Sequence, residues 1–176
     1  RGGSVVVQGS VSSQYLSGLL MTAPCTEQGM YMRVAGELVS KPYIDLTLQT
    51  MSAFGVDVEA HPEYREFRVP SSHYIPTTVQ IEPDASAASY FFAAAAITGG
   101  RVRVEGLGTR TTQGDLRFVE ILRRMGAEVT MTSGWTEVRG TGNLHGVEVD
   151  MRNISDTAQT LAVVATFADS PTEITG

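Results

Sequence analysis

The sequence FGVDV at residues 54–58 joins the end of a helical pattern to the start of an extended one, and it is one of the stretches by which repeat units can be recognised in the chain. A related sequence, MGAEV, follows about 71 positions later at residues 125–129. A second pair has a similar offset, with GMYMRV at residues 29–34 and GGRVRV at residues 99–104. Repeats of this kind are typical of folds in which copies of one unit bury their faces against each other. The chain is therefore predicted to contain an internal repeat.

Apolar periodicity predicts that each repeat unit has the order strand-helix-strand-helix-strand-strand. In the first copy we expect strands at residues 4–8, 30–35, 56–59 and 66–69, and helices at residues 11–23 and 42–54. In the second copy we expect strands at residues 78–82, 101–105, 128–132 and 136–139, and helices at residues 85–97 and 114–125. A third copy begins with a strand at residues 147–150, a helix at residues 155–168 and a strand that ends at Thr175. The expected fold class is α/β.

The composition excludes several classes of protein. With 42% hydrophobic and 18% charged residues, the chain can bury a core and is not disordered. Its single cysteine excludes a disulfide scaffold and a cysteine-based zinc site. A net charge of −6 argues against a nucleic-acid binder that works through bulk charge. No stretch approaches the roughly 20 apolar residues of a membrane span, and no signal peptide is recognised.

The two ends and one internal stretch suggest that this is part of a longer, two-domain protein. The sequence begins at Arg1 and ends at Gly176, directly after an expected strand, where a natural domain rarely stops. The stretch PSSHYIPTT at residues 70–78 lies between the first two copies and is the best candidate for a crossing between domains.

A turn with the sequence GSVSSQ at residues 9–14 leads from the first expected strand into the first expected helix. The first turn of a helix has unpaired N–H groups and a partial positive charge, and Ser12, Ser13 and Gln14 add further donors. This combination favours an anion-binding site. The alternative is that Ser12 or Ser13 only caps the helix.

A second helix start, GELVSKPY at residues 36–43, allows the same two interpretations. Ser40 suits the N-cap, and Pro42 lies near the first helical position, where its missing N–H costs nothing. In the functional interpretation, Ser40 and Tyr43 point toward the same polar ligand as the serines of the first helix start. Both helix starts would open at the same end of the unit.

Two acidic residues also lie at expected helix starts. Asp84 is most simply a cap, and Asp156 in a first turn stabilises a helix. Asp156 could instead face a cleft and accept a hydroxyl proton as a general base. Cys25 has no evident base nearby, the three histidines lack metal-ligand spacing, and no glycine-rich nucleotide loop is present. The function classes that remain are a cofactor-free reaction on anionic substrates and simple ligand binding.

Together these segments resemble the 5-enolpyruvylshikimate-3-phosphate (EPSP) synthase family. The resemblance rests on four stretches in the family's order: GSVSSQ at residues 9–14, GELVSKPYID at 36–45, DASAASYF at 84–91 and QGD at 113–115. It implies the enolpyruvyl transferase two-domain fold, an inside-out α/β barrel of six repeat units that is incomplete in this chain. Residues 1–78 would be the C-terminal part of the domain on the shikimate-3-phosphate side, and residues 79–176 the first part of the second domain.

The resemblance also implies an activity: transfer of the enolpyruvyl group from phosphoenolpyruvate to the 5-hydroxyl of shikimate 3-phosphate, with release of phosphate. This step of the shikimate pathway leads to chorismate and the aromatic amino acids. Ser12, Ser13 and Gln14 match positions that bind shikimate 3-phosphate, the serines holding its phosphate. Ser40 and Tyr43 match further contacts to that substrate.

Asp156 matches the acidic residue that binds the shikimate ring hydroxyls and is proposed as the proton acceptor. The family implies no metal or organic cofactor, no nucleic-acid or membrane partner, a monomeric parent and a cytoplasmic location. The residues that clamp phosphoenolpyruvate would lie before Arg1 and beyond Gly176, so the piece alone is expected to be inactive. Lys41, the only lysine, receives no catalytic role.

Two alternatives stay open. One is the related transferase that acts on UDP-N-acetylglucosamine, which the serine pair and the SKPY segment disfavour. The other is a non-catalytic module of the same fold.

Overall fold

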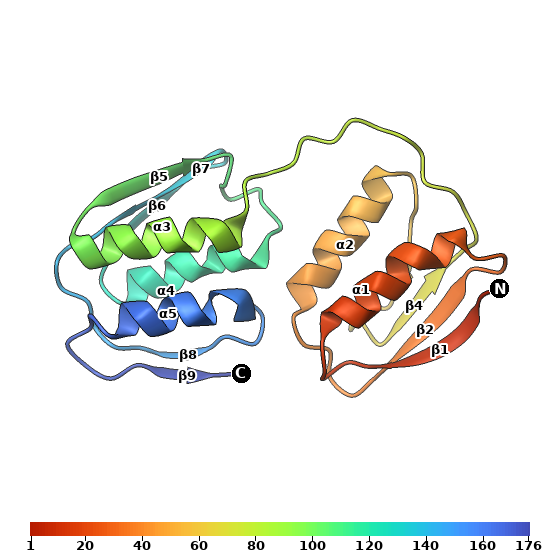
Figure 1. Ribbon diagram of the computed structural model, residues 1–176, viewed down its shortest axis with the longest axis horizontal. Coiled ribbons are helices and arrows are strands. Elements are labelled where there is room, and N and C mark those ends of the chain that lie inside the picture. Colours follow the sequence, from red (N-terminus) through yellow and green to blue (C-terminus); the bar gives the residue numbers. More distant parts are fainter. The chain divides into compact units, whose positions relative to one another are not determined.

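A computed structural model covers all 176 residues, Arg1–Gly176. The chain forms two compact units, Arg1–Gln80 and Ile81–Gly176 (Figure 1). Each unit has its own cluster of buried apolar side chains.

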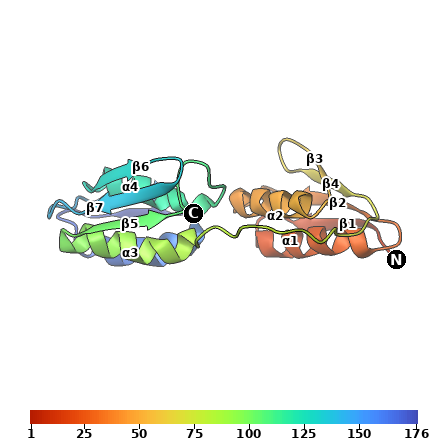
Figure 2. The same ribbon diagram turned by 90° about the horizontal axis from the view of Figure 1, so that it is seen from above.

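The first unit is a four-stranded sheet with two helices packed on it (Figures 1 and 2). Its strands lie in the order β1-β2-β4-β3, with the bounds β1 Gly3–Gln8, β2 Met30–Ala35, β3 Glu59–Ala60 and β4 Glu66–Val69. The helices are α1 Ser13–Thr22, which runs into a 3₁₀ turn at Ala23–Cys25, and α2 Lys41–Ala53. Strands β1 and β2 are parallel because α1 carries the chain back between them. Strand β4 is antiparallel to both β2 and β3.

The second unit contains three helices and two small sheets, and Figure 1 shows the helices between the sheets. The helices are α3 Ala85–Thr98, α4 Phe118–Arg124 and α5 Ala158–Ala165, with 3₁₀ turns at Gly114–Arg117 and Ser155–Thr157 before α4 and α5. The antiparallel sheet has the order β5-β7-β6, with the bounds β5 Arg101–Glu105, β6 Glu128–Met131 and β7 Trp135–Arg139. The parallel sheet pairs β8 Glu148–Asp150 with β9 Glu173–Thr175.

The strand pairings confirm the repeated unit. In the first unit β2 pairs with β4 and β4 with β3, and in the second unit β5, β7 and β6 pair in the same order. The parallel pair β8-β9 repeats the parallel pair β1-β2. The part β2-β4-β3 of the first copy therefore recurs as β5-β7-β6 in the second, and the opening parallel pair recurs in the third.

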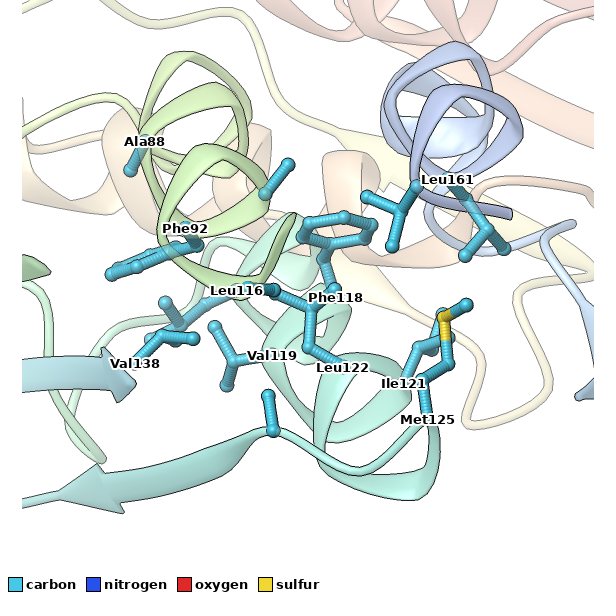
Figure 3. Close-up of a cluster of buried hydrophobic side chains, with 14 of the residues drawn as sticks. Ala88, Phe92, Leu116, Phe118, Val119, Ile121, Leu122, Met125, Val138 and Leu161 are labelled. Carbon is cyan, nitrogen blue, oxygen red and sulfur yellow. The ribbon is translucent and has the colours of Figure 1, made fainter. Parts of the chain in front are cut away.

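The core of the second unit lies where α3 and α4 pack against β7 and α5 (Figure 3). Phe92 from α3 and Phe118 and Leu122 from α4 are at most 1% exposed. Val138 of β7 and Leu161 of α5 complete the cluster and are fully buried. Because α3 has alanines around these contacts, its neighbours approach closely, as its composition suggests.

The expected strand at residues 78–82 is wrong. These residues are all exposed and form no strand, because no neighbouring strand supplies hydrogen-bond partners for them. Their alternation of apolar and polar residues has the right period, but that pattern does not by itself provide a pairing partner.

Three other elements are shorter than expected. Of the strand expected at residues 56–59, only the two-residue β3, Glu59–Ala60, is found. The expected strand does not begin at Val56 because the Val56 N–H donates to the Met51 carbonyl at 2.9 Å, at the end of α2. The third-copy helix begins as a 3₁₀ turn, where the Thr157 hydroxyl donates to the Ile154 carbonyl at 2.9 Å. The helix expected from residue 114 likewise begins as a 3₁₀ turn.

The crossing between the units lies at residues 76–81, later than the expected 70–78, because residues 71–75 still make hydrogen bonds to the first unit. The N–H of Ile75 donates to the Phe54 carbonyl at 2.8 Å in the first unit. The side-chain amide of Gln113 donates to the Glu82 carboxylate at 3.0 Å in the second unit. Residues 76–81, between these contacts, are exposed and make no hydrogen bond.

Candidate functional site

Two helix starts meet at one edge of the first sheet because β1 and β2 are parallel and end side by side. After Gln8 pairs with Ala35, the N–H of Gly9 donates to the Ala35 carbonyl at 2.9 Å. The Gly9 carbonyl accepts from the N–H of Val39 at 3.1 Å. A Cβ at residue 9 would lie 2.9 Å from the Glu37 carbonyl oxygen, so this approach requires glycine. The loops that precede α1 and α2 are thus held against each other.

The first helix start has the donors that the sequence predicts. The Ser12 hydroxyl oxygen accepts from the N–H of Gln14 at 3.2 Å, so Ser12 does cap α1. Its hydroxyl hydrogen remains able to donate, because a hydroxyl both donates and accepts. Ser13 is the first residue of α1 and is 5% exposed, whereas the Gln14 side chain is exposed.

The second helix start differs from a simple cap. Ser40 occupies the N-cap position but has φ 56° and ψ 40°, and its side chain does not cap α2. Tyr43 donates its backbone N–H to the Ser40 carbonyl at 3.1 Å. A serine in the left-handed region costs about 1–3 kcal/mol, and such conformations cluster at functional sites. Ser40 therefore occupies the predicted N-cap position, with Pro42 in the first turn, but its side chain does not cap α2.

A hollow of about 610 Å³ lies beside the start of α2. It is lined by residues 36–38, Lys41 and the turn at residues 62–65 between β3 and β4. In that turn Tyr64 has φ 59°, and its hydroxyl donates to the Asp45 carboxylate on α2. This hydrogen bond is the main cause that raises the pKa of Tyr64 to about 12, with burial and the Asp45 charge adding to it.

The turn at residues 62–65 was not identified from the sequence. Nothing in its residue types signals a left-handed tyrosine or a bond to a helix 19 residues away. Its charges are mixed, since Arg65 pairs with Glu63 at 2.6 Å. The turn therefore forms one wall of the hollow, and these two opposite charges add no net charge to it.

Asp156 lies in the second unit, in the 3₁₀ turn that precedes α5. Its side chain is exposed and makes no hydrogen bond within the chain, while its carbonyl accepts from the Gln159 side-chain amide at 2.5 Å. Asp84 contrasts with it, because the Asp84 carboxylate accepts from the N–H of Ala87 at 3.0 Å and caps α3. The carboxylate of Asp156 thus has no partner within this chain, whereas that of Asp84 caps α3.

No group of three or more His, Cys, Asp or Glu side chains is arranged to hold a metal ion. None of the helices combines the length and apolar character needed to cross a bilayer.

Comparison with known proteins identifies the family. The family model for EPSP synthase (3-phosphoshikimate 1-carboxyvinyltransferase) matches residues 1–176. The chain belongs to the EPSP synthase family. Proteins named 3-phosphoshikimate 1-carboxyvinyltransferase from Serratia proteamaculans and Yersinia pestis are each 50% identical to it over 176 residues. These matches cover 99% of the chain but only 41% of each relative, so the chain spans less than half of those EPSP synthases.

Solved structures support the same fold. The enolpyruvyl transferase NikO from Streptomyces tendae matches with a TM-score of 0.74 and 20% identity, over 98% of this chain and 43% of its own. An EPSP synthase from Acinetobacter baumannii matches with a TM-score of 0.73 and 24% identity, over 99% of this chain and 41% of its own. The expected enolpyruvyl transferase fold is confirmed, in an incomplete form.

Proposed function

We propose that the protein containing this chain transfers the enolpyruvyl group of phosphoenolpyruvate to the 5-hydroxyl of shikimate 3-phosphate and releases phosphate. The supporting observation is the pair of helix starts held at one edge of the first sheet, in a chain of the EPSP synthase family. Curated relatives at 50% identity have the corresponding name. The reaction is a step of the shikimate pathway toward aromatic amino acids.

In this proposal the phosphate of shikimate 3-phosphate binds at the start of α1. The N–H of Gln14 already donates to Ser12, so the other N–H groups of the first turn and the Ser12 and Ser13 hydroxyls are the donors proposed to bind the anion. The exposed amide of Gln14 adds a donor beside them. Ser40 and Tyr43 contact the same substrate from the adjacent start of α2.

Asp156 is the proposed base. The 5-hydroxyl oxygen attacks C2 of phosphoenolpyruvate while C3 gains a proton, giving a tetrahedral intermediate that still carries phosphate. Loss of phosphate and of a C3 proton then restores the enol ether. A carboxylate beside the attacking hydroxyl accepts its proton, and the exposed Asp156 side chain suits that role.

The proposed placement of the chain within the whole protein follows from the family. Residues 1–78 belong to the domain on the shikimate-3-phosphate side, and residues 79–176 begin the second domain. The groups that clamp phosphoenolpyruvate and protonate C3 come from outside these residues. The whole protein is a cytoplasmic monomer that acts on these two small molecules, without a cofactor and without nucleic-acid or membrane partners.

Phosphate release by the full-length protein tests this function. With phosphoenolpyruvate present, we expect release with shikimate 3-phosphate and none with UDP-N-acetylglucosamine as acceptor. Release with the sugar nucleotide alone would assign the protein to the other transferase activity. Release with neither acceptor would indicate a non-catalytic module.

A further inference from the structure

Two hydroxyls are buried between α3 and α5, among alanine and aromatic side chains. Ser89 on α3 is 1% exposed and Thr160 on α5 is 4% exposed, and their hydroxyl oxygens lie 3.1 Å apart. The Ser89 hydroxyl donates to the Ser86 carbonyl at 2.6 Å. Because a hydroxyl has one hydrogen, the Thr160 hydroxyl must donate to the Ser89 oxygen.

This is the one hydrogen bond that joins α3 to α5. The remaining contacts between the two helices are apolar, and apolar contacts have no preferred direction. A hydrogen bond weakens quickly when its angle changes. The pair therefore adds a directional contact between α5 and α3 to this apolar packing.

The partner helix α3 is itself fixed at its start. The N–H of Ala85 donates to the Gln113 side-chain oxygen at 2.8 Å. The Ser86 hydroxyl donates to the carboxylate of Asp115, a residue only 4% exposed. The start of α3 is a firm reference point within the second unit.

The start of α5 has no side-chain cap, and the two side-chain hydrogen bonds there, from Thr157 to the Ile154 carbonyl at 2.9 Å and from Gln159 to the Asp156 carbonyl at 2.5 Å, stay within the segment, so the Thr160–Ser89 bond is its one hydrogen bond to α3. Asp156 lies in that turn, four residues before Thr160, which is about one helical turn. We infer that the Thr160–Ser89 hydrogen bond is a positioning contact that holds the Asp156 carboxylate in place for catalysis; this rests on the function proposed above.

The test uses the full-length protein and compares kcat, KM for both substrates and thermal unfolding. Thr160→Val keeps the side-chain shape and removes the hydroxyl, and it should lower kcat roughly tenfold because small displacements of a reacting group are costly. KM for phosphoenolpyruvate should not change. Thr160→Ser keeps the hydroxyl and should keep kcat within about twofold of the unchanged protein, because the donor is still present.

A matched control is available in the same unit. Thr136 on β7 is fully buried, and its hydroxyl has no hydrogen-bond partner. Thr136→Val makes the same chemical change without breaking a hydrogen bond and should keep kcat. Equal loss of kcat in both valine variants would overturn the inference, because the loss would then follow from the substitution and not from the Thr160 contact.

Asp156→Asn separates this inference from the proposed function. If Asp156→Asn lowers kcat and Thr160→Val does not, Asp156 is the base but the hydroxyl pair does not position it. If Asp156→Asn leaves kcat unchanged, the role of Asp156 itself is wrong. Should Thr160→Val fail to fold, Ser89→Ala removes the acceptor with a smaller change in an alanine-rich helix, and the same outcomes apply.

Discussion

Ser40 shows how a single residue separates what sequence can and cannot predict about the site. Its position at a helix start was predictable from the following proline and the helical pattern. Its left-handed backbone and the absence of a side-chain cap were not, because neither residue type nor helical periodicity signals them. Ser12, in contrast, caps α1 as local sequence suggests. Residue type predicted which side chains can donate hydrogen bonds at the two helix starts, but it did not predict the conformation in which each is held.

Removing both serine hydroxyls at the start of α1 should chiefly weaken binding of shikimate 3-phosphate. In the full-length protein, Ser12→Ala with Ser13→Ala removes two hydrogen bonds to a charged group, each worth roughly 1.5–3 kcal/mol, so the Kd should rise at least about 100-fold. Titration calorimetry measures this change. Ser10→Ala, in the preceding turn, is the control and should leave the Kd unchanged. Equal Kd values for the double variant and the unchanged protein would contradict phosphate binding at this helix start.

The Tyr64 hydroxyl should stabilise the first unit only below strongly alkaline pH. The pKa of Tyr64 is raised from 10.0 to about 12, mainly by its hydrogen bond to Asp45. The stabilisation by the Tyr64 hydroxyl is complete below the tyrosine pKa of the unfolded chain, and it is lost as the pH rises through the Tyr64 pKa of the folded chain. The stability difference between unchanged protein and Tyr64→Phe should therefore be constant below pH 10 and disappear between about pH 10 and 12.

Denaturant unfolding of the full-length protein across this pH range measures the difference. Tyr15→Phe provides the control, because Tyr15 is 66% exposed and has no hydrogen-bond partner. A Tyr64 difference that persists unchanged at pH 12 would mean that the hydroxyl does not bond to Asp45 in solution.

At the scale of helices and strands, the sequence predicted the elements whose hydrophobic pattern lies within their own residues. Alternation and helical periodicity predicted β1, β2, α1 and α2 close to their observed bounds. The error at residues 78–82 arose because a strand also needs a neighbour, which period-two alternation does not reveal. The 3₁₀ turn at Ser155–Thr157 was missed because it depends on a local hydroxyl bond rather than on periodicity.

Two glycines should respond oppositely to alanine because their surroundings differ. A Cβ on Gly18 in α1 meets no atom within 4 Å, so Gly18→Ala should stabilise the protein by about 0.5–1 kcal/mol through helix propensity. A Cβ on Gly140, after β7, would lie 2.3 Å from the Ala95 carbonyl oxygen of α3. Gly140→Ala should therefore lower the unfolding midpoint in denaturant. A neutral result for Gly140→Ala would show that α3 and the end of β7 are less closely packed than described.

At the scale of the whole molecule, the chain holds only part of the proposed active site. Its proposed contacts are to shikimate 3-phosphate, and the groups that clamp phosphoenolpyruvate are expected elsewhere. We predict that this 176-residue chain alone releases no phosphate from the two substrates, whereas the full-length protein does. A coupled phosphate assay on both proteins measures this. Turnover by the chain alone that requires both substrates would place a complete site within it.

The crossing at residues 76–81 has a practical consequence for engineering. Its backbone makes no hydrogen bond and its side chains are exposed, so it contributes to neither core. Exposed connections of this kind tolerate a break or an insertion best. A cut here would leave each half with its own sheet, helices and interior. Within this 176-residue chain, an insertion or a break at residues 76–81 should therefore disturb the two cores least.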